Sequence, residues 1–107
     1  WKTRTLDQIV VSTGGGIVMD AENQVFIKKN GYAVWLDAGA ETILKRLQAD
    51  GSTADFRPAL TSAGVLAETR DMLEVRRPLY ERTAHLRIET DTLTPWMIVT
   101  LIERSLF

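Results

Sequence analysis

Short apolar runs alternate with amphipathic segments along this chain. The runs typical of short strands lie at residues 9–13, 33–36 and 86–89. The segments with helical periodicity lie at residues 21–29, 40–49, 65–76, 78–83 and 95–106. Strands that alternate with helices favour a parallel sheet with right-handed crossover connections. The alternation therefore predicts an α/β fold, built on a parallel sheet of three strands with flanking helices.

Residues that favour helix ends stand at the borders of several predicted helices. Asp20 can cap the helix that starts at residue 21, and Gly31 follows its last turn. Thr94 and Pro95 form a typical helix start, with the threonine as cap and the proline in the first turn. Pro78 also suits a first turn, which predicts that a separate short helix begins there.

The length of 107 residues fits a single domain, residues 1–107. A parallel sheet is normally covered by helices on both faces. Three strands with four or five helices make a thin core for that architecture, so we expect the chain to be part of a larger α/β domain. Residues 50–61 contain Gly, Ser, Asp and Pro with little periodicity, which predicts an irregular loop.

Charge and composition narrow the classes of function. Thirteen basic residues nearly balance fourteen acidic ones, giving a formal net charge of −1, which argues against a nucleic-acid partner. The chain has no cysteine, so disulfides and thiolate metal sites are excluded and a cytoplasmic location is expected. No apolar run is long enough to span a bilayer, so no membrane partner is expected. The single histidine, His85, is predicted to be a packing residue.

The glycine triplet Gly14, Gly15 and Gly16 directly follows the first predicted strand. Ligands of open parallel sheets bind beyond the carboxyl ends of the strands. Glycines let a ligand approach the backbone closely and leave amide N–H groups free to donate. The triplet is therefore either a ligand-binding loop or a tight turn between a strand and a helix.

Two arginine motifs can supply positive charge to an anionic ligand. Arg57 lies in the irregular stretch, where a mobile loop could close over phosphates, although a solvated surface arginine fits the same pattern. Arg76 and Arg77 are neighbours on a predicted helix and cannot face the same way. Either one of them holds an anion bidentately, or both are surface charges paired with Glu74 and Glu81.

Taken together and in this order, the motifs resemble those of the shikimate kinase family. The matching segments are Val10-Val11-Ser12-Thr13-Gly14-Gly15-Gly16, Val34-Trp35-Leu36-Asp37, Arg57-Pro58-Ala59-Leu60 and Arg76-Arg77-Pro78-Leu79-Tyr80. A short strand and a turn into the proline-started helix complete the pattern. The resemblance implies the fold of a P-loop small-molecule kinase with a lid loop. The pairing of the glycine triplet with the Arg-x-Pro-Leu-Tyr segment argues against another small phosphotransferase, such as a gluconate-kinase-like enzyme.

The resemblance also implies a reaction and its acid-binding residues. The terminal phosphate of ATP would move to shikimate, giving shikimate 3-phosphate on the route to aromatic amino acids. The backbone of Gly14, Gly15 and Gly16 would hold shikimate, and Arg76 resembles the arginine that grips its carboxylate. Shikimate and ATP are therefore the expected partners.

The nucleotide side of the site follows from the same resemblance. Arg57 would act in catalysis by reaching the ATP phosphates from a lid at about residues 50–61. Arg46 would stack on the adenine ring, and Pro95 would flank that ring. Magnesium is the expected cofactor, with no metal ligand assigned among these residues.

One part of the family pattern does not occur in the chain. The 107 residues contain no Gly-x-x-x-x-Gly-Lys-Ser/Thr, the loop that cradles nucleotide phosphates and supplies a magnesium-binding hydroxyl. We therefore expect the isolated chain to be inactive. We also expect it to self-associate through the unpaired edge of strand 9–13, or to rearrange so that this edge is covered. The alternative is a non-catalytic acid-binding or interaction module derived from a small-molecule kinase.

Overall fold

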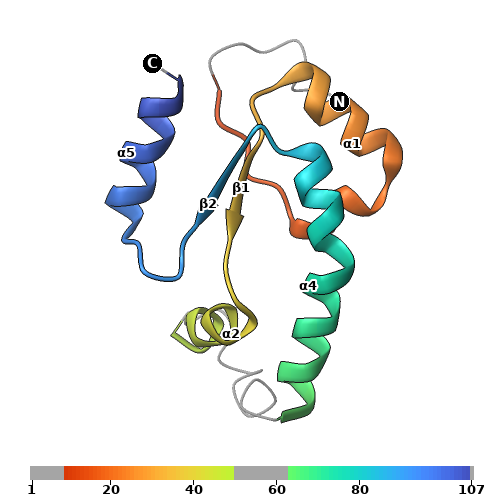
Figure 1. Cartoon of the computed structure of the whole chain (residues 1–107), viewed down its shortest axis with the longest axis vertical. Coiled ribbons are helices and arrows are strands. Elements are labelled where there is room, and N and C mark those ends of the chain that lie inside the picture. Colours follow the sequence, from red (N-terminus) through yellow and green to blue (C-terminus); the bar gives the residue numbers. More distant parts are fainter. Residues whose placement is uncertain (1–8, 50–62, 107) are drawn as a thin grey trace.

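The computed structural model describes residues 9–49 and 63–106, which form a mixed α/β fold (Figure 1). In chain order the elements are the 3-10 helix η2 (Gly15–Met19), α1 (Ala21–Asn30), β1 (Val34–Asp37), α2 (Ala40–Ala49), α4 (Ala63–Thr83), β2 (Leu86–Glu89) and α5 (Pro95–Leu106). The predicted fold class is thereby confirmed.

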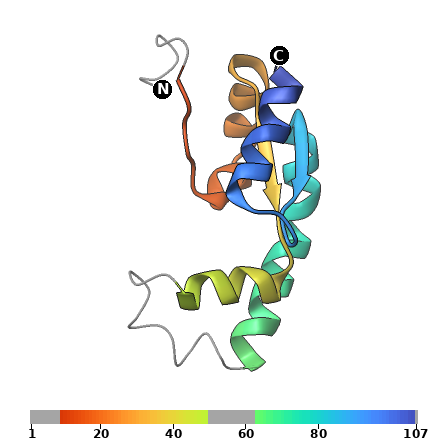
Figure 2. The same ribbon diagram turned by 90° about the vertical axis from the view of Figure 1, so that its left-hand side faces the viewer.

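The described sheet consists of β1 and β2, which run parallel with Val34 opposite Leu86 and Asp37 opposite Glu89. Because side chains alternate along a strand, Trp35 and Asp37 share one face of the sheet. Helix α4 lies on that face, and α5 lies on the opposite side, as the two views show (Figures 1 and 2). Both faces of the short sheet are thus flanked by helices.

The strand predicted at residues 9–13 is not a strand in the structure. This segment is extended but runs beside the sheet without joining it (Figure 2). β-branched residues favour extended backbone, but a strand also needs a neighbour whose backbone completes the hydrogen-bond ladder. In the described part of the chain, β1 and β2 pair only with each other, and residues 9–13 pair with neither.

The predicted starts of α1 and α5 are confirmed. The Glu22 backbone N–H donates to Oδ1 of Asp20 at 2.8 Å, which caps the first turn of α1. The Met97 N–H donates to Oγ1 of Thr94 at 3.2 Å, which caps α5 directly before Pro95. Side-chain capping therefore sets where both helices begin.

The expected break at Pro78 is absent, because α4 runs without interruption from Ala63 to Thr83. A proline inside a helix has no N–H to donate and costs stability. Side chains on both sides of Pro78 nevertheless pack against the sheet, Arg77 on Asp37 and Tyr80 on Trp35. We infer that these contacts outweigh the cost of the proline and keep the helix continuous.

The buried apolar side chains of the described residues are few: Val18, Trp35, Ala40, Leu44 and Ile88. Large apolar side chains elsewhere are open to solvent, and Val10 is fully exposed while Leu36 on β1 is 54% exposed. None of the described helices combines the length and apolar character that crossing a membrane requires.

Polar contacts around Asp37 join three elements of the fold. Oδ2 of Asp37, at the end of β1, accepts from Arg77 on α4 at 3.1 Å and from Nε and Nη2 of Arg87 on β2 at 3.0 and 2.5 Å. Both guanidinium groups lie over the Trp35 ring, at 5.8 and 4.9 Å from its centroid. The hydrogen bond to Asp37 raises the pKa of Arg87, so this partner stays charged. The ion pairs attach α4 and β2 to the end of β1.

We predict that Asp37→Asn lowers the free energy of unfolding by about 1–3 kcal/mol, measured by urea denaturation. The Asp37 side chain is only 8% exposed, so a neutral amide leaves two arginines facing each other with no buried counter-charge. Glu41→Gln is the matched control, because it removes the ion pair of Glu41 with Arg70, in which both side chains are more than half exposed. Exposed pairs contribute at most about 1 kcal/mol. Equal losses for the two variants would contradict the role given to Asp37.

Candidate functional site

The glycine triplet forms a turn where the extended residues 9–13 enter η2. The Ile17 N–H donates to the carbonyl of Gly14 at 3.2 Å, and Gly15 and Gly16 are exposed. The turn reaches α4 at the level where β1 ends, as both views show (Figures 1 and 2). It therefore lies at the carboxyl end of the strands, where ligands of open parallel sheets bind.

Arg76 on α4 lies directly beside this turn. A Cβ atom added at Gly15 would stand 3.1 Å from Nη1 of Arg76, and one added at Gly16 would stand 3.5 Å from Nη2. Arg76 is half-buried and has no hydrogen-bond or ion-pair partner among the described residues. The structure thus brings together the glycine triplet and Arg76, two motifs that are far apart in the sequence.

Arg76 and Arg77 face different ways, as predicted. Arg77 donates to Asp37 and lies over Trp35, whereas Arg76 lies at the glycine turn. Within the described residues, neither arginine forms the ion pairs with glutamates that the alternative interpretation requires. The charge of Arg77 is already compensated by a buried carboxylate, so of these two arginines Arg76 is the one that has no compensating partner in the part of the chain that the structure describes.

Tyr80 also lies at the glycine turn beside Arg76, although its role was not predicted. Its hydroxyl donates to the carbonyl of Gly15 at 3.0 Å, and its ring packs on Trp35 with the centroids 5.4 Å apart. Tyr80 follows Arg76 by four residues, which places both on one face of a helix. That spacing is the signal in the sequence that could have identified Tyr80.

Arg46 and Pro95 border the loop that follows β2. The guanidinium of Arg46 donates to Oγ1 and to the carbonyl of Thr90, at 2.9 and 2.8 Å. Thr90 is buried, and Pro95 begins α5 a few residues later. The structure therefore holds Arg46, which was predicted to contact adenine, against the turn that leads to Pro95.

Asp91 fastens the same loop to the start of α2. Its Oδ1 accepts from the Gly39 N–H at 3.0 Å. This hydrogen bond, a second one with the Thr42 side chain and the nearby charge of Arg46 lower the pKa of Asp91. The carboxylate is therefore ionised near neutral pH and fixes the turn that separates β2 from Pro95.

Two further predictions concern the lid with Arg57, and the expected magnesium. Arg57 and the lid predicted at residues 50–61 fall in the part of the chain that the structure leaves undescribed. Within residues 9–49 and 63–106, no three acidic or histidine side chains gather closely enough to hold a metal ion.

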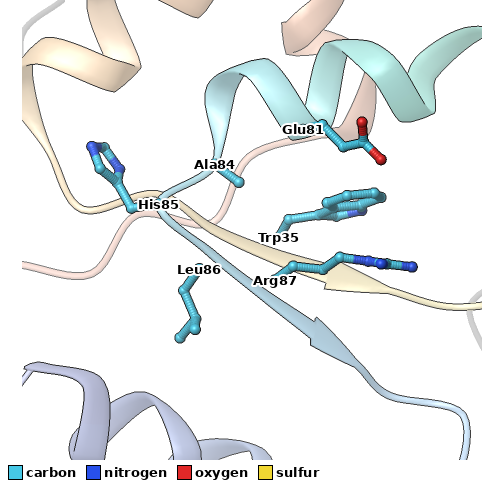
Figure 3. Close-up of a pocket in the computed structure, with 6 residues that line it drawn as sticks. All are labelled: Trp35, Glu81, Ala84, His85, Leu86 and Arg87. Carbon is cyan, nitrogen blue, oxygen red and sulfur yellow. The ribbon is translucent and has the colours of Figure 1, made fainter.

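A shallow pocket of about 190 Å³ lies between the end of α4 and β2 (Figure 3). Its lining residues are Trp35, Glu81, Ala84, His85, Leu86 and Arg87. Figure 3 shows the Arg87 side chain lying along the Trp35 ring, so this wall of the pocket belongs to the Asp37 ion-pair cluster. His85 is exposed, so the prediction of a partly buried packing residue is wrong on burial. Its Nδ1 accepts the Ala33 N–H at 2.9 Å, and its ring stacks on Tyr32.

The fold and the site define a class of protein. A parallel α/β arrangement sets an arginine with no ion-pair partner in residues 9–49 and 63–106 beside a glycine turn, at the carboxyl end of its strands. Such an arrangement is suited to bind a small anionic ligand. Comparison with known proteins gives the family. A family model described as shikimate kinase matches residues 2–106, and the chain belongs to this family.

Individual relatives agree with the family model. The shikimate kinase of Rhodopirellula baltica is 41% identical over 83 residues, which are 78% of this chain and 44% of that protein. The shikimate kinase of Neisseria gonorrhoeae is 42% identical over 89 residues, 83% of this chain and 50% of that protein. The shikimate kinase of Hahella chejuensis is 36% identical over 100 residues, 94% of this chain and 50% of that protein. The chain thus spans about half the length of these curated relatives.

Proposed function

We propose that this chain supplies the acid-binding part of an enzyme that transfers the terminal phosphate of ATP to shikimate, giving shikimate 3-phosphate. One observation carries the proposal: Arg76, which is half-buried and has no counter-ion among the described residues, lies beside the exposed glycine turn. Membership of the shikimate kinase family supports shikimate as the acid and ATP as the phosphate donor.

The geometry around Arg76 suits recognition of a carboxylate. A guanidinium can give two parallel hydrogen bonds to a carboxylate, and such charge-assisted bonds are the stronger ones. Exposed amides of Gly15 and Gly16 next to Arg76 can donate to further oxygens of the substrate. Phosphoryl transfer needs little covalent chemistry from the protein, so these residues would act by positioning the substrate.

The nucleotide would bind on the side of Arg46 and Pro95. Arg46 is held by Thr90 at the turn before Pro95, which supports the proposal that the adenine ring lies between the guanidinium and the proline. Arg57 would bring positive charge to the phosphates. Magnesium would balance phosphate charge, held largely by the phosphates themselves, since the described residues bring no three acidic or histidine side chains together. We further propose that the reaction takes place in the cytoplasm.

We predict that Arg76→Ala weakens shikimate binding roughly ten- to hundredfold, because a charge-assisted contact to the carboxylate is lost. Arg77→Ala should leave the affinity nearly unchanged while lowering stability, because Arg77 is engaged with Asp37. Calorimetric titration of the protein at its natural length measures both affinities.

Two comparisons sharpen this test. A shikimate analogue with a neutral amide in place of the carboxylate should bind Arg76→Ala and the unmodified protein equally weakly. Equal affinities of the Arg76→Ala and Arg77→Ala variants for shikimate would refute the assignment of the carboxylate to Arg76.

The 107 residues taken alone should show no shikimate-dependent release of ADP and should self-associate. They contain no phosphate-binding loop sequence, and the exposed Val10 and Leu36 offer apolar surface to a second copy. A coupled ADP assay and light scattering measure these two properties. A monomer would contradict the association, and turnover would contradict the inactivity. If the protein at its natural length binds shikimate but shows no turnover, the non-catalytic acid-binding module is favoured instead.

A further inference from the structure

We propose that Tyr80 is a positioning residue for the acid-binding site, which holds the glycine turn at a fixed distance from Arg76. The inference rests on the proposed function, because the ligand concerned is the shikimate carboxylate. Tyr80 is assigned no contact with substrate. Its effect passes through the backbone of Gly15, whose carbonyl accepts the Tyr80 hydroxyl at 3.0 Å.

The Tyr80 hydroxyl lies close to Gly15, where a side chain would displace it. A Cβ atom at Gly15 would stand 2.6 Å from the Tyr80 hydroxyl oxygen, well inside contact distance, whereas at Gly14 it would meet nothing within 4 Å. The hydroxyl therefore occupies the space that any other residue at position 15 would need. Gly15 and Tyr80 are matched to each other.

The Tyr80 ring is itself braced by the sheet. It packs on Trp35, which is 9% exposed on β1 and lies under the guanidinium groups of Arg77 and Arg87. A tyrosine has only two side-chain torsions, so ring packing leaves its hydroxyl little freedom. The position of the Gly15 carbonyl is thus set from β1 through two aromatic rings.

Within residues 9–49 and 63–106, few other contacts hold the glycine turn in place. The helix η2 has no side-chain cap at Gly14, and the preceding residues 9–13 are not paired with a strand. The far end of η2 is tied by Gln24, whose Nε2 donates to the Val18 carbonyl at 2.6 Å. Tyr80 ties the near end, the one beside Arg76. A turn held in place before the ligand arrives costs less ordering on binding.

The test is Tyr80→Phe in the protein at its natural length, which removes one oxygen and keeps the ring. Tyr32→Phe is the matched control, because Tyr32 is the other tyrosine of the sequence and its hydroxyl is hydrogen-bonded to Ser105, outside the site. In Tyr80→Phe the KM for shikimate should rise about three- to tenfold, the effect of one hydrogen bond, with the KM for ATP unchanged. Without ligand, the Ile17 amide should exchange with solvent faster. Tyr32→Phe should change neither quantity.

Gly15→Ala provides a second route to the same contact if Tyr80→Phe folds poorly. The added methyl group should displace the Tyr80 hydroxyl and also crowd Nη1 of Arg76, 3.1 Å away, so Gly15→Ala should raise the KM for shikimate at least as much as Tyr80→Phe does. Because both variants remove the same hydrogen bond, the double variant should be no worse than Gly15→Ala alone. Gly31→Ala is its control, because Gly31 lies outside the site and a Cβ atom there would meet only the Ile27 carbonyl, at 3.9 Å.

The possible failures are distinguishable. Faster Ile17 exchange in Tyr80→Phe without a change in the KM for shikimate would overturn the positioning role and leave only a structural one. Unchanged exchange and unchanged KM would overturn the contact itself. If the unmodified protein does not bind shikimate at all, the proposed function fails, and the inference fails with it.

Discussion

The ion pairs of the buried Asp37 carboxylate are the contacts on which the described part of the molecule depends. A carboxylate taken out of water is costly unless charged partners surround it. Here one oxygen accepts hydrogen bonds from Arg77 and Arg87, which come from α4 and β2. The parallel strands bring Arg87 next to Trp35, and α4 brings Arg77 over the same ring. The helix is thereby fixed both in position and in rotation about its axis.

The rotation of α4 decides which arginine meets a ligand. Successive residues of a helix point about 100° apart, so a helix that turns Arg77 toward the sheet must turn Arg76 elsewhere. In this molecule Arg76 points toward the glycine turn, and Tyr80, one helical turn further along α4, contacts the same glycine turn. One helix therefore carries the contacts that hold the fold and, on a neighbouring face, the charge that we assign to the substrate.

Much of the fold follows from local chemistry that the sequence displays. The starts of α1 and α5 were predictable because Asp20 and Thr94 cap their own helices, a contact within a few residues. The strand at residues 9–13 was predicted wrongly because pairing depends on a partner that a β-branched run does not reveal. The break at Pro78 was also wrong, since tertiary contacts of the flanking residues hold α4 together.

The candidate site, like the fold, was predictable from the sequence only in part. The order of motifs pointed to the glycine triplet and to Arg76 through a family resemblance, but the residues alone left Arg76 and Arg77 as alternatives. Choosing between them required Asp37, whose proximity to Arg77 is a property of the folded chain. The spacing of Tyr80 from Arg76 places both on one face of α4, but the partner of Tyr80 is a backbone carbonyl, which that spacing does not identify. The role of Arg57 stays a prediction.

The central claim is that α4 and the glycine turn together form the acid-binding site. It is tested most directly by an NMR titration of the natural-length protein with shikimate, following the amides of Gly15 and Gly16 and the Nε–H of each arginine. The account predicts that both glycine amides and Arg76 shift together and saturate with one equivalent of shikimate, while Arg77 stays unchanged. Shifts confined to Arg46 and its surroundings, with the glycine turn and Arg76 unaffected, would contradict it.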